Sequence, residues 1–179
     1  MTVGQVKQKA LKIIDEYSGA AVLNPDTALR IADLCDMGQK QLAQMVRIVK
    51  EYPLPEQTNH HYPMPADFYA VRRVWKGNHP LQNIGRWLGN TLILHSGTSP
   101  AGVTVEYFAL PKTVDIDTPD STELEIAPDA QQCLPYFVAW QLLLGDPSAD
   151  VRAVAELYDR SVATLCTRLP GSAVVRKCR

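Results

Sequence analysis

The residues of this chain that could carry chemistry are two adjacent histidines and an isolated serine. His60 and His61 could ligate a metal ion, but adjacent side chains diverge in a helix or a strand and make a poor ligand pair. Ser96 lacks the glycine two positions earlier that a nucleophile elbow requires. The sequence contains neither GxGxxG nor GxxxxGK(S/T) as a phosphate-binding loop. We therefore expect no catalytic residue, no metal site and no cofactor, and hence no enzyme.

An acidic segment, residues 112–127, is the other candidate for a binding site. Asp115, Asp117 and Asp120 have the spacing of carboxylates in a calcium-binding loop. An EF-hand loop needs glycine at its sixth position and glutamate at its twelfth. Asp120 and Ile126 occupy these positions, so we interpret the segment as a solvated acidic connector.

The elements around these residues follow from apolar periodicity. Helical spacing recurs within residues 1–52 and again within residues 128–170, and each stretch predicts a helical hairpin. Between them, prolines and polar residues from position 53 onward predict a loop, followed by strands over residues 69–75, 86–95 and 103–109. The predicted fold is α+β: a four-helix bundle from two helical hairpins (αα–β–αα) with a small antiparallel sheet inserted between them. Trp75, Trp87 and Tyr107 are predicted to form the core of that sheet.

Length and composition restrict the function classes further. The chain has 179 residues, which predicts a single domain over residues 1–179, with the acidic connector at 112–127 and a C-terminal tail at 171–179. Its 18 Lys and Arg nearly balance 19 Asp and Glu, which argues against a dedicated nucleic-acid or membrane-surface binder. Four cysteines without a CxxC pair, and apolar stretches too short to cross a bilayer, predict a protein made in a reducing cytoplasm without contact to a membrane.

Several short stretches together resemble the head-to-tail adaptor proteins of tailed bacteriophages, which include the tail tubular proteins of short-tailed phages. The stretches are ALKIIDE at 10–16, DMGQKQLA at 36–43, YPMPADFY at 62–69 with VW at 74–75, VEYFALP at 105–111, DID at 115–117 and EIAPDA at 125–130. The resemblance extends over nearly the whole chain.

The resemblance implies a structural protein in the neck of the virion, made in the cytoplasm of the bacterial host. Such adaptors form a homo-oligomeric ring below the portal, usually twelvefold, which joins the head to the tail and continues the DNA channel. The implied partners are the portal ring, the next neck or tail protein, further copies of the chain, and double-stranded DNA that passes without specific binding. The family's C-terminal segment commonly reaches the portal, so the portal-contact candidates here are Val174, Val175, Arg176, Lys177 and Arg179.

Near-neutral charge suits a channel wall that must not retain passing DNA. The predicted lumen residues are therefore the acidic ones of the connector: Asp115, Asp117, Asp120 and Glu123. Two alternatives stay open at this point. One is another neck component, such as a stopper or tail-completion protein, and the other is a small cytoplasmic enzyme.

Overall fold

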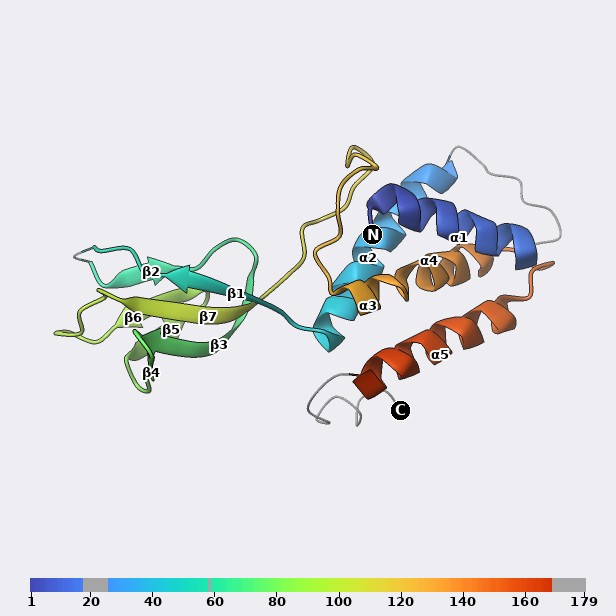
Figure 1. Ribbon diagram of the computed structural model, residues 1–179. Coiled ribbons are helices and arrows are strands. Elements are labelled where there is room, and N and C mark those ends of the chain that lie inside the picture. Colours follow the sequence, from blue (N-terminus) through green and yellow to red (C-terminus); the bar gives the residue numbers. More distant parts are fainter. Residues whose placement is uncertain (18–25, 58, 169–179) are drawn as a thin grey trace. The chain divides into compact units, whose positions relative to one another are not determined.

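The computed structural model describes residues 1–17, 26–57 and 59–168 (Figure 1). The chain divides into two compact units. We call them the helical unit, formed by Met1–Val46 together with the chain from Pro111 onward, and the β unit, formed by Arg47–Leu110. Each has its own buried residues, and each is described by itself below.

The helical unit is organised around one apolar helix. Its elements are α1 (Val3–Tyr17), α2 (Asp26–Met45), the short α3 (Pro128–Gln131), α4 (Leu134–Leu143) and α5 (Val151–Arg168). In α4, apolar residues occupy nearly every position, and those that are buried are Leu134, Pro135, Phe137, Val138, Ala139 and Leu143. A helix that is apolar on all sides must be surrounded. Accordingly α1, α2 and α5 all pack against α4, which lies between α1 and α5 in Figure 1.

The predicted bundle of two helical hairpins with a small sheet is therefore wrong, although the α+β class is right. Helices α1 and α2 contact each other little, because both use their apolar faces on α4. Helix α2 ends at Met45, and the stretch that was expected to continue it forms strand β1, Ile48–Pro53. Burial alternates along β1, so the apolar spacing that had the appearance of a helical stripe has the period of a strand.

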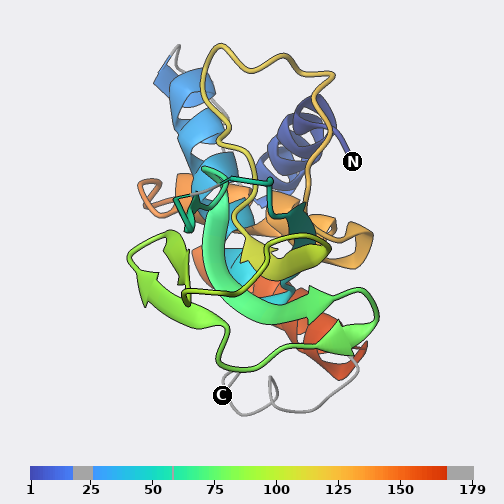
Figure 2. The same ribbon diagram turned by 90° about the vertical axis from the view of Figure 1, so that its left-hand side faces the viewer.

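The β unit contains two antiparallel sheets in place of the single small sheet that was predicted (Figure 2). The four-stranded sheet has the order β1, β7 (Val103–Ala109), β3 (Phe68–Lys76) and β4 (His79–Pro80). The three-stranded sheet has the order β2 (His61–Pro63), β6 (Thr91–Leu94) and β5 (Gly85–Leu88). The segment predicted as one strand over residues 86–95 turns back at Gly89, whose φ is 55°, and so forms the hairpin of β5 and β6.

Alternate residues of β7 define the core of the β unit: Val103, Val105, Tyr107 and Ala109 are buried. The ring of Phe68 stacks on that of Trp87 with centroids 5.6 Å apart, and it lies at the same distance from the ring of Tyr107. Trp87 packs against this core and is partly buried. Trp75 is half-buried, with the guanidinium of Arg73 5.8 Å from the centre of its ring.

Candidate assembly surfaces

The acidic connector is attached at its start to helix α2. The Asp36 carboxylate accepts a hydrogen bond from the backbone N–H of Val114 at 3.0 Å and one from the Lys40 ammonium at 2.5 Å. Gln39 is almost fully buried, and its amide donates to the carbonyl oxygen of Lys112 at 2.5 Å. Burying a polar side chain is costly unless it is hydrogen-bonded, and here the connector backbone supplies the partner. Residues 112–114 are thereby held in place.

Gly38, between these polar residues, brings α2 close to α4. A Cβ atom at this position would lie 2.5 Å from Leu134 Cδ1 and 2.6 Å from Phe137 Cδ1. Both neighbours are buried, so only glycine fits without displacing the apolar helix. The DMGQKQLA stretch therefore joins α2 to α4 on one side and to the connector on the other.

The end of the connector is attached to the start of α1. The N–H groups of Val3 and Gly4 donate to the carbonyl oxygens of Thr122 and Asp120, each at 2.9 Å. The Lys7 ammonium lies 2.7 Å from the carboxylate of Asp120. These bonds satisfy two of the N–H groups that the first turn of a helix leaves without a partner.

The connector presents most of its acidic side chains to solvent. All four predicted lumen residues are exposed: Asp115, Asp117, Asp120 and Glu123. Asp115 accepts a hydrogen bond from the Thr118 hydroxyl at 2.7 Å within a local turn. Ile116 is 47% exposed, which places an apolar side chain between two carboxylates. The connector is thus an anchored acidic loop with one apolar side chain at its surface.

A second polar cluster holds the β unit together around Asp67, in the YPMPADFY stretch. Its carboxylate accepts hydrogen bonds from the Lys50 ammonium at 2.8 Å and from the Tyr107 hydroxyl at 3.0 Å. Burial alone would raise the pKa of Asp67, but these two bonds and the charge of Lys50 outweigh it and hold that pKa below its usual value. Asp67 thereby links β1, β7 and the start of β3.

The outward side of the four-stranded sheet combines aromatic and basic side chains. Residues that face each other in an antiparallel sheet share a side, so the exposed side follows from the pairing of β7 with its neighbours. The Arg47 guanidinium lies 5.6 Å from the ring centre of Tyr69 and 5.0 Å from that of Phe108. We define the aromatic–arginine face by the following residues: Arg47, Val49, Glu51, Tyr69, Arg72, Arg73, Trp75, Glu106 and Phe108. This face was not predicted from the sequence, although the alternating residues of β7 indicate that one side of the strand faces outward.

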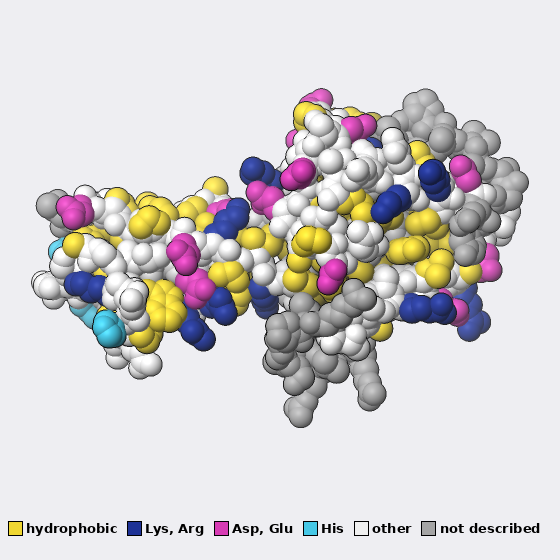
Figure 3. Space-filling view, in the orientation of Figure 1, with side chains coloured by type: hydrophobic (Ala, Val, Ile, Leu, Met, Phe, Trp, Pro, Cys, Tyr) yellow, Lys and Arg dark blue, Asp and Glu magenta, His cyan; other side chains and the backbone are white. Residues whose placement is uncertain are grey.

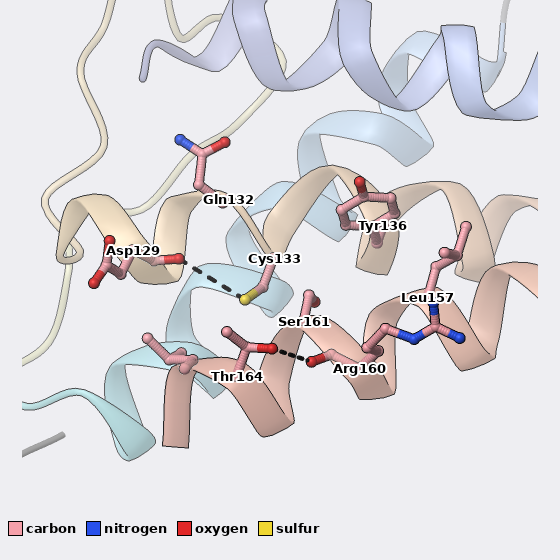
Figure 4. Close-up of a pocket in the computed structure, with 9 residues that line it drawn as sticks. Asp129, Gln132, Cys133, Tyr136, Leu157, Arg160, Ser161 and Thr164 are labelled. Carbon is pink, nitrogen blue, oxygen red and sulfur yellow. Dashed lines mark hydrogen bonds between the residues drawn. The ribbon is translucent and has the colours of Figure 1, made fainter. Parts of the chain in front are cut away.

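A groove of about 270 Å³ lies between α4 and α5 (Figure 4). Its lining is largely apolar, with Asp129, Cys133 and Tyr136 on one side and Arg160 and Ser161 on the other. Figure 4 shows Cys133 at the side facing α5, with its thiol directed at the carbonyl oxygen of Asp129. The largely apolar lining favours contact with an apolar surface.

The two cysteines that the structure gives as free thiols, Cys35 and Cys133, are not activated. Burial raises the pKa of Cys35 to about 12, and burial likewise raises the pKa of Cys133. A thiol must lose its proton to act as a nucleophile or metal ligand. Cys35 and Cys133 therefore behave as small apolar residues, in keeping with their positions in the helical unit.

Three further features complete the survey of the described part of the chain. Within residues 1–17, 26–57 and 59–168, no three His, Cys, Asp or Glu side chains are grouped as a metal ion would require. No helix in these ranges is long and apolar enough to cross a membrane. The portal-contact candidates, Val174, Val175, Arg176, Lys177 and Arg179, lie outside the described residues.

Comparison with known proteins gives no further assignment. No protein-family model matches the chain, and no curated protein matches it either. The function must therefore be argued from the sequence resemblance and from the surfaces described above.

Proposed function

We propose that this protein is a head-to-tail adaptor of a tailed bacteriophage. It would form a ring below the portal, join the head to the tail and continue the DNA channel. Its partners would be the portal ring, the next neck or tail protein and further copies of itself, with twelve subunits as the expected ring size. Its site of action would be the neck of the virion.

The observation that carries the proposal is the structural role of the residues behind the resemblance. Gly38 in DMGQKQLA sets the contact between α2 and α4, and Asp36 and Gln39 hold the connector. Asp67 and Phe68 in YPMPADFY link three strands and contribute to the aromatic core. Because the residues that resemble the adaptor family also hold the helices and strands together, the sequence resemblance supports a similar fold. Resemblance confined to exposed positions would support it less.

A ring component also needs two different surfaces, one for each neighbour, since head-to-tail contacts close a ring only when the two sides differ. The anchored acidic connector and the aromatic–arginine face differ in both chemistry and unit of origin. This supports an assembling protein over an enzyme. That the connector residues Asp115, Asp117, Asp120 and Glu123 line the channel stays a prediction.

The proposal is tested by native mass spectrometry of the purified chain with and without the portal ring encoded in the same genome. We expect the portal mass to rise by the mass of one ring of this protein. A folded chain that leaves the portal mass unchanged would contradict the adaptor function. If the chain instead adds to the portal only together with another neck protein, it is a stopper or tail-completion protein.

The C-terminal tail is tested in the same experiment. Deletion of residues 172–179 is expected to abolish portal binding while the circular dichroism spectrum stays the same. The control replaces only the charges of the tail, by R176A, K177A and R179A, and separates charge from chain length. Full portal binding by the deletion variant would refute the assignment of the tail to the portal contact.

A further inference from the structure

We propose that the aromatic–arginine face of the β unit binds the acidic connector of a second copy of this chain. The inference deepens the proposed function and rests on it for one step, the closing of such contacts into a ring. The contact itself requires only the two surfaces described above. It joins different surfaces on the two copies, so each copy keeps one of each kind free for the next neighbour.

The charges of the two units are complementary. Residues Arg47–Leu110 carry six Lys and Arg against four Asp and Glu, whereas the rest of the chain carries twelve against fifteen. Figure 3 shows basic side chains among hydrophobic and some acidic ones over the β unit, and acidic side chains around the connector loop, drawn in gold between β7 and α3 in Figure 1. Electrostatic complementarity of this kind directs association and selects the partner surface.

The face has the composition of a protein-binding surface. Tyr69 is 49% exposed and Val49 41% exposed, and Val49 lies opposite Phe108 in the sheet. Arg47 contacts the rings of both Tyr69 and Phe108. A guanidinium stacked on a ring still presents its N–H edge, and that edge fits a carboxylate with two parallel hydrogen bonds. Aromatic residues and arginine are the types enriched where proteins bind each other.

The same face is unsuited to a nucleic acid. Bases stack on free aromatic rings, but Arg47 lies over the rings of Tyr69 and Phe108, and Arg73 lies over Trp75. Glu106 lies opposite Glu51 in the sheet, and this negative charge disfavours phosphates and carboxylates alike, so the contact is assigned to Arg47 and Arg73, which lie over aromatic rings. Arg72 is already paired with Glu106 at 2.6 Å. An acidic peptide loop therefore fits this surface better than a strand of DNA or RNA.

The connector has the matching features. Asp117 and Glu123 are exposed, and Ile116 offers an apolar side chain to the rings. The hydrogen bonds to α1 and α2 hold the loop in one shape, so binding costs little ordering entropy. In such a ring these carboxylates would lie between neighbouring copies and other residues would line the channel, which makes this inference an alternative to the predicted lumen position.

The test exchanges charges between the two surfaces. The variant D117K/E123K makes the connector basic, and the variant R47E/R73E makes the face acidic. Each alone is expected to weaken self-association at least about tenfold in sedimentation velocity, because each places like charges in contact. An equimolar mixture is expected to restore association, as is the variant with all four changes, because opposite charges then meet again. Circular dichroism and thermal unfolding verify that each variant is folded.

The matched control for D117K/E123K is D15K/D159K, which makes the same change in net charge at two exposed positions outside both surfaces. It is expected to associate as the unaltered chain does. Absence of self-association by the unaltered chain, normal association of either single-surface variant, or failure of the mixture to recover would each overturn the proposal. Loss of binding to a single-stranded oligonucleotide by R47E/R73E, with self-association unchanged, would reassign the face to nucleic acid.

Native mass spectrometry of the charge-exchange variants with the portal ring distinguishes failure of this inference from failure of the proposed function. Portal binding that survives all the charge exchanges, with ring size unchanged, would refute the contact and leave the adaptor function intact. Charge-dependent self-association without portal binding would refute the adaptor function and leave the contact intact.

Discussion

Replacing Gly38 with alanine tests how closely α2 and α4 approach. The added methyl group would lie 2.5 Å from Leu134 Cδ1 and 2.6 Å from Phe137 Cδ1, well inside van der Waals contact. Leu134 is fully buried and Phe137 is 3% exposed, so moving either side chain disturbs the packing around α4. The substitution must therefore displace these side chains or move the two helices apart.

Two free-energy terms of opposite sign decide the result. Alanine in place of glycine within a helix stabilises by about 1 kcal/mol. Overpacking a filled core destabilises by about 1–3 kcal/mol, and two overlaps with buried neighbours favour the upper part of that range. The expected net loss is about 1–2 kcal/mol in the free energy of unfolding. For a chain of this size, that lowers the Tm by about 2–8 °C.

The assay is thermal and chemical unfolding of Gly38→Ala beside Gly145→Ala. Gly145 is a matched control, because a Cβ atom there meets nothing within 4 Å. The control is expected to change the Tm little. The double variant with Leu134→Ala should lose less stability than the sum of the two single losses, because the smaller side chain makes room for the methyl group. An increase in Tm for Gly38→Ala, or strict additivity with Leu134→Ala, would refute the close packing.

Four other expectations follow from the contacts. Asp36→Ala leaves the buried N–H of Val114 without its acceptor and should cost about 1–3 kcal/mol in urea unfolding; an unchanged midpoint would contradict the connector attachment. The pKa of Asp67 is lowered on folding, so its contribution is present above about pH 4 and lost as the pH falls further; Asp67→Asn should flatten the acid loss of Tm. Gly85→Ala places Cβ 2.1 Å from a carbonyl oxygen of the paired strand and should lower the Tm more than Gly38→Ala does. The thiol of Cys35, whose pKa burial raises to about 12, should react with a disulfide reagent only after unfolding.

Local pattern was sufficient wherever an element's own residues decide its structure. Strand β7 occupies the predicted residues 103–109, because its apolar residues alternate over the whole length. Proline is tolerated in the first turn of a helix but not in its interior, and α4 accordingly begins at Leu134 with Pro135 in its first turn. The acidic connector was likewise identified from composition, and its carboxylates are exposed.

Prediction from apolar spacing failed where a short stretch fits both the helical and the strand period. Val46 and Val49 continue the spacing of α2, yet Val49 lies in β1 and pairs with Phe108. Only the presence of β7, more than fifty residues later in the chain, makes the strand favourable there. The segment from residue 53 onward was predicted to be a loop because of its prolines. Part of it, His61–Pro63, nevertheless pairs with β6 at the edge of a sheet, and this pairing also depends on residues far along the chain.

The α+β class, most elements, the acidic connector and the absence of the usual catalytic motifs could be predicted from the sequence, because these depend on residue type and local spacing. The tertiary structure alone decided that α4 is the centre of the helical unit, that the strands form two sheets, and that Asp36 and Gly38 hold the connector and α4. It also decided which side of β7 faces outward and brought Arg47 to Tyr69 and Phe108. These features join residues far apart in the chain. Periodicity shows that a helix or strand has an apolar face, but the partner for that face is chosen by the packing of the whole unit.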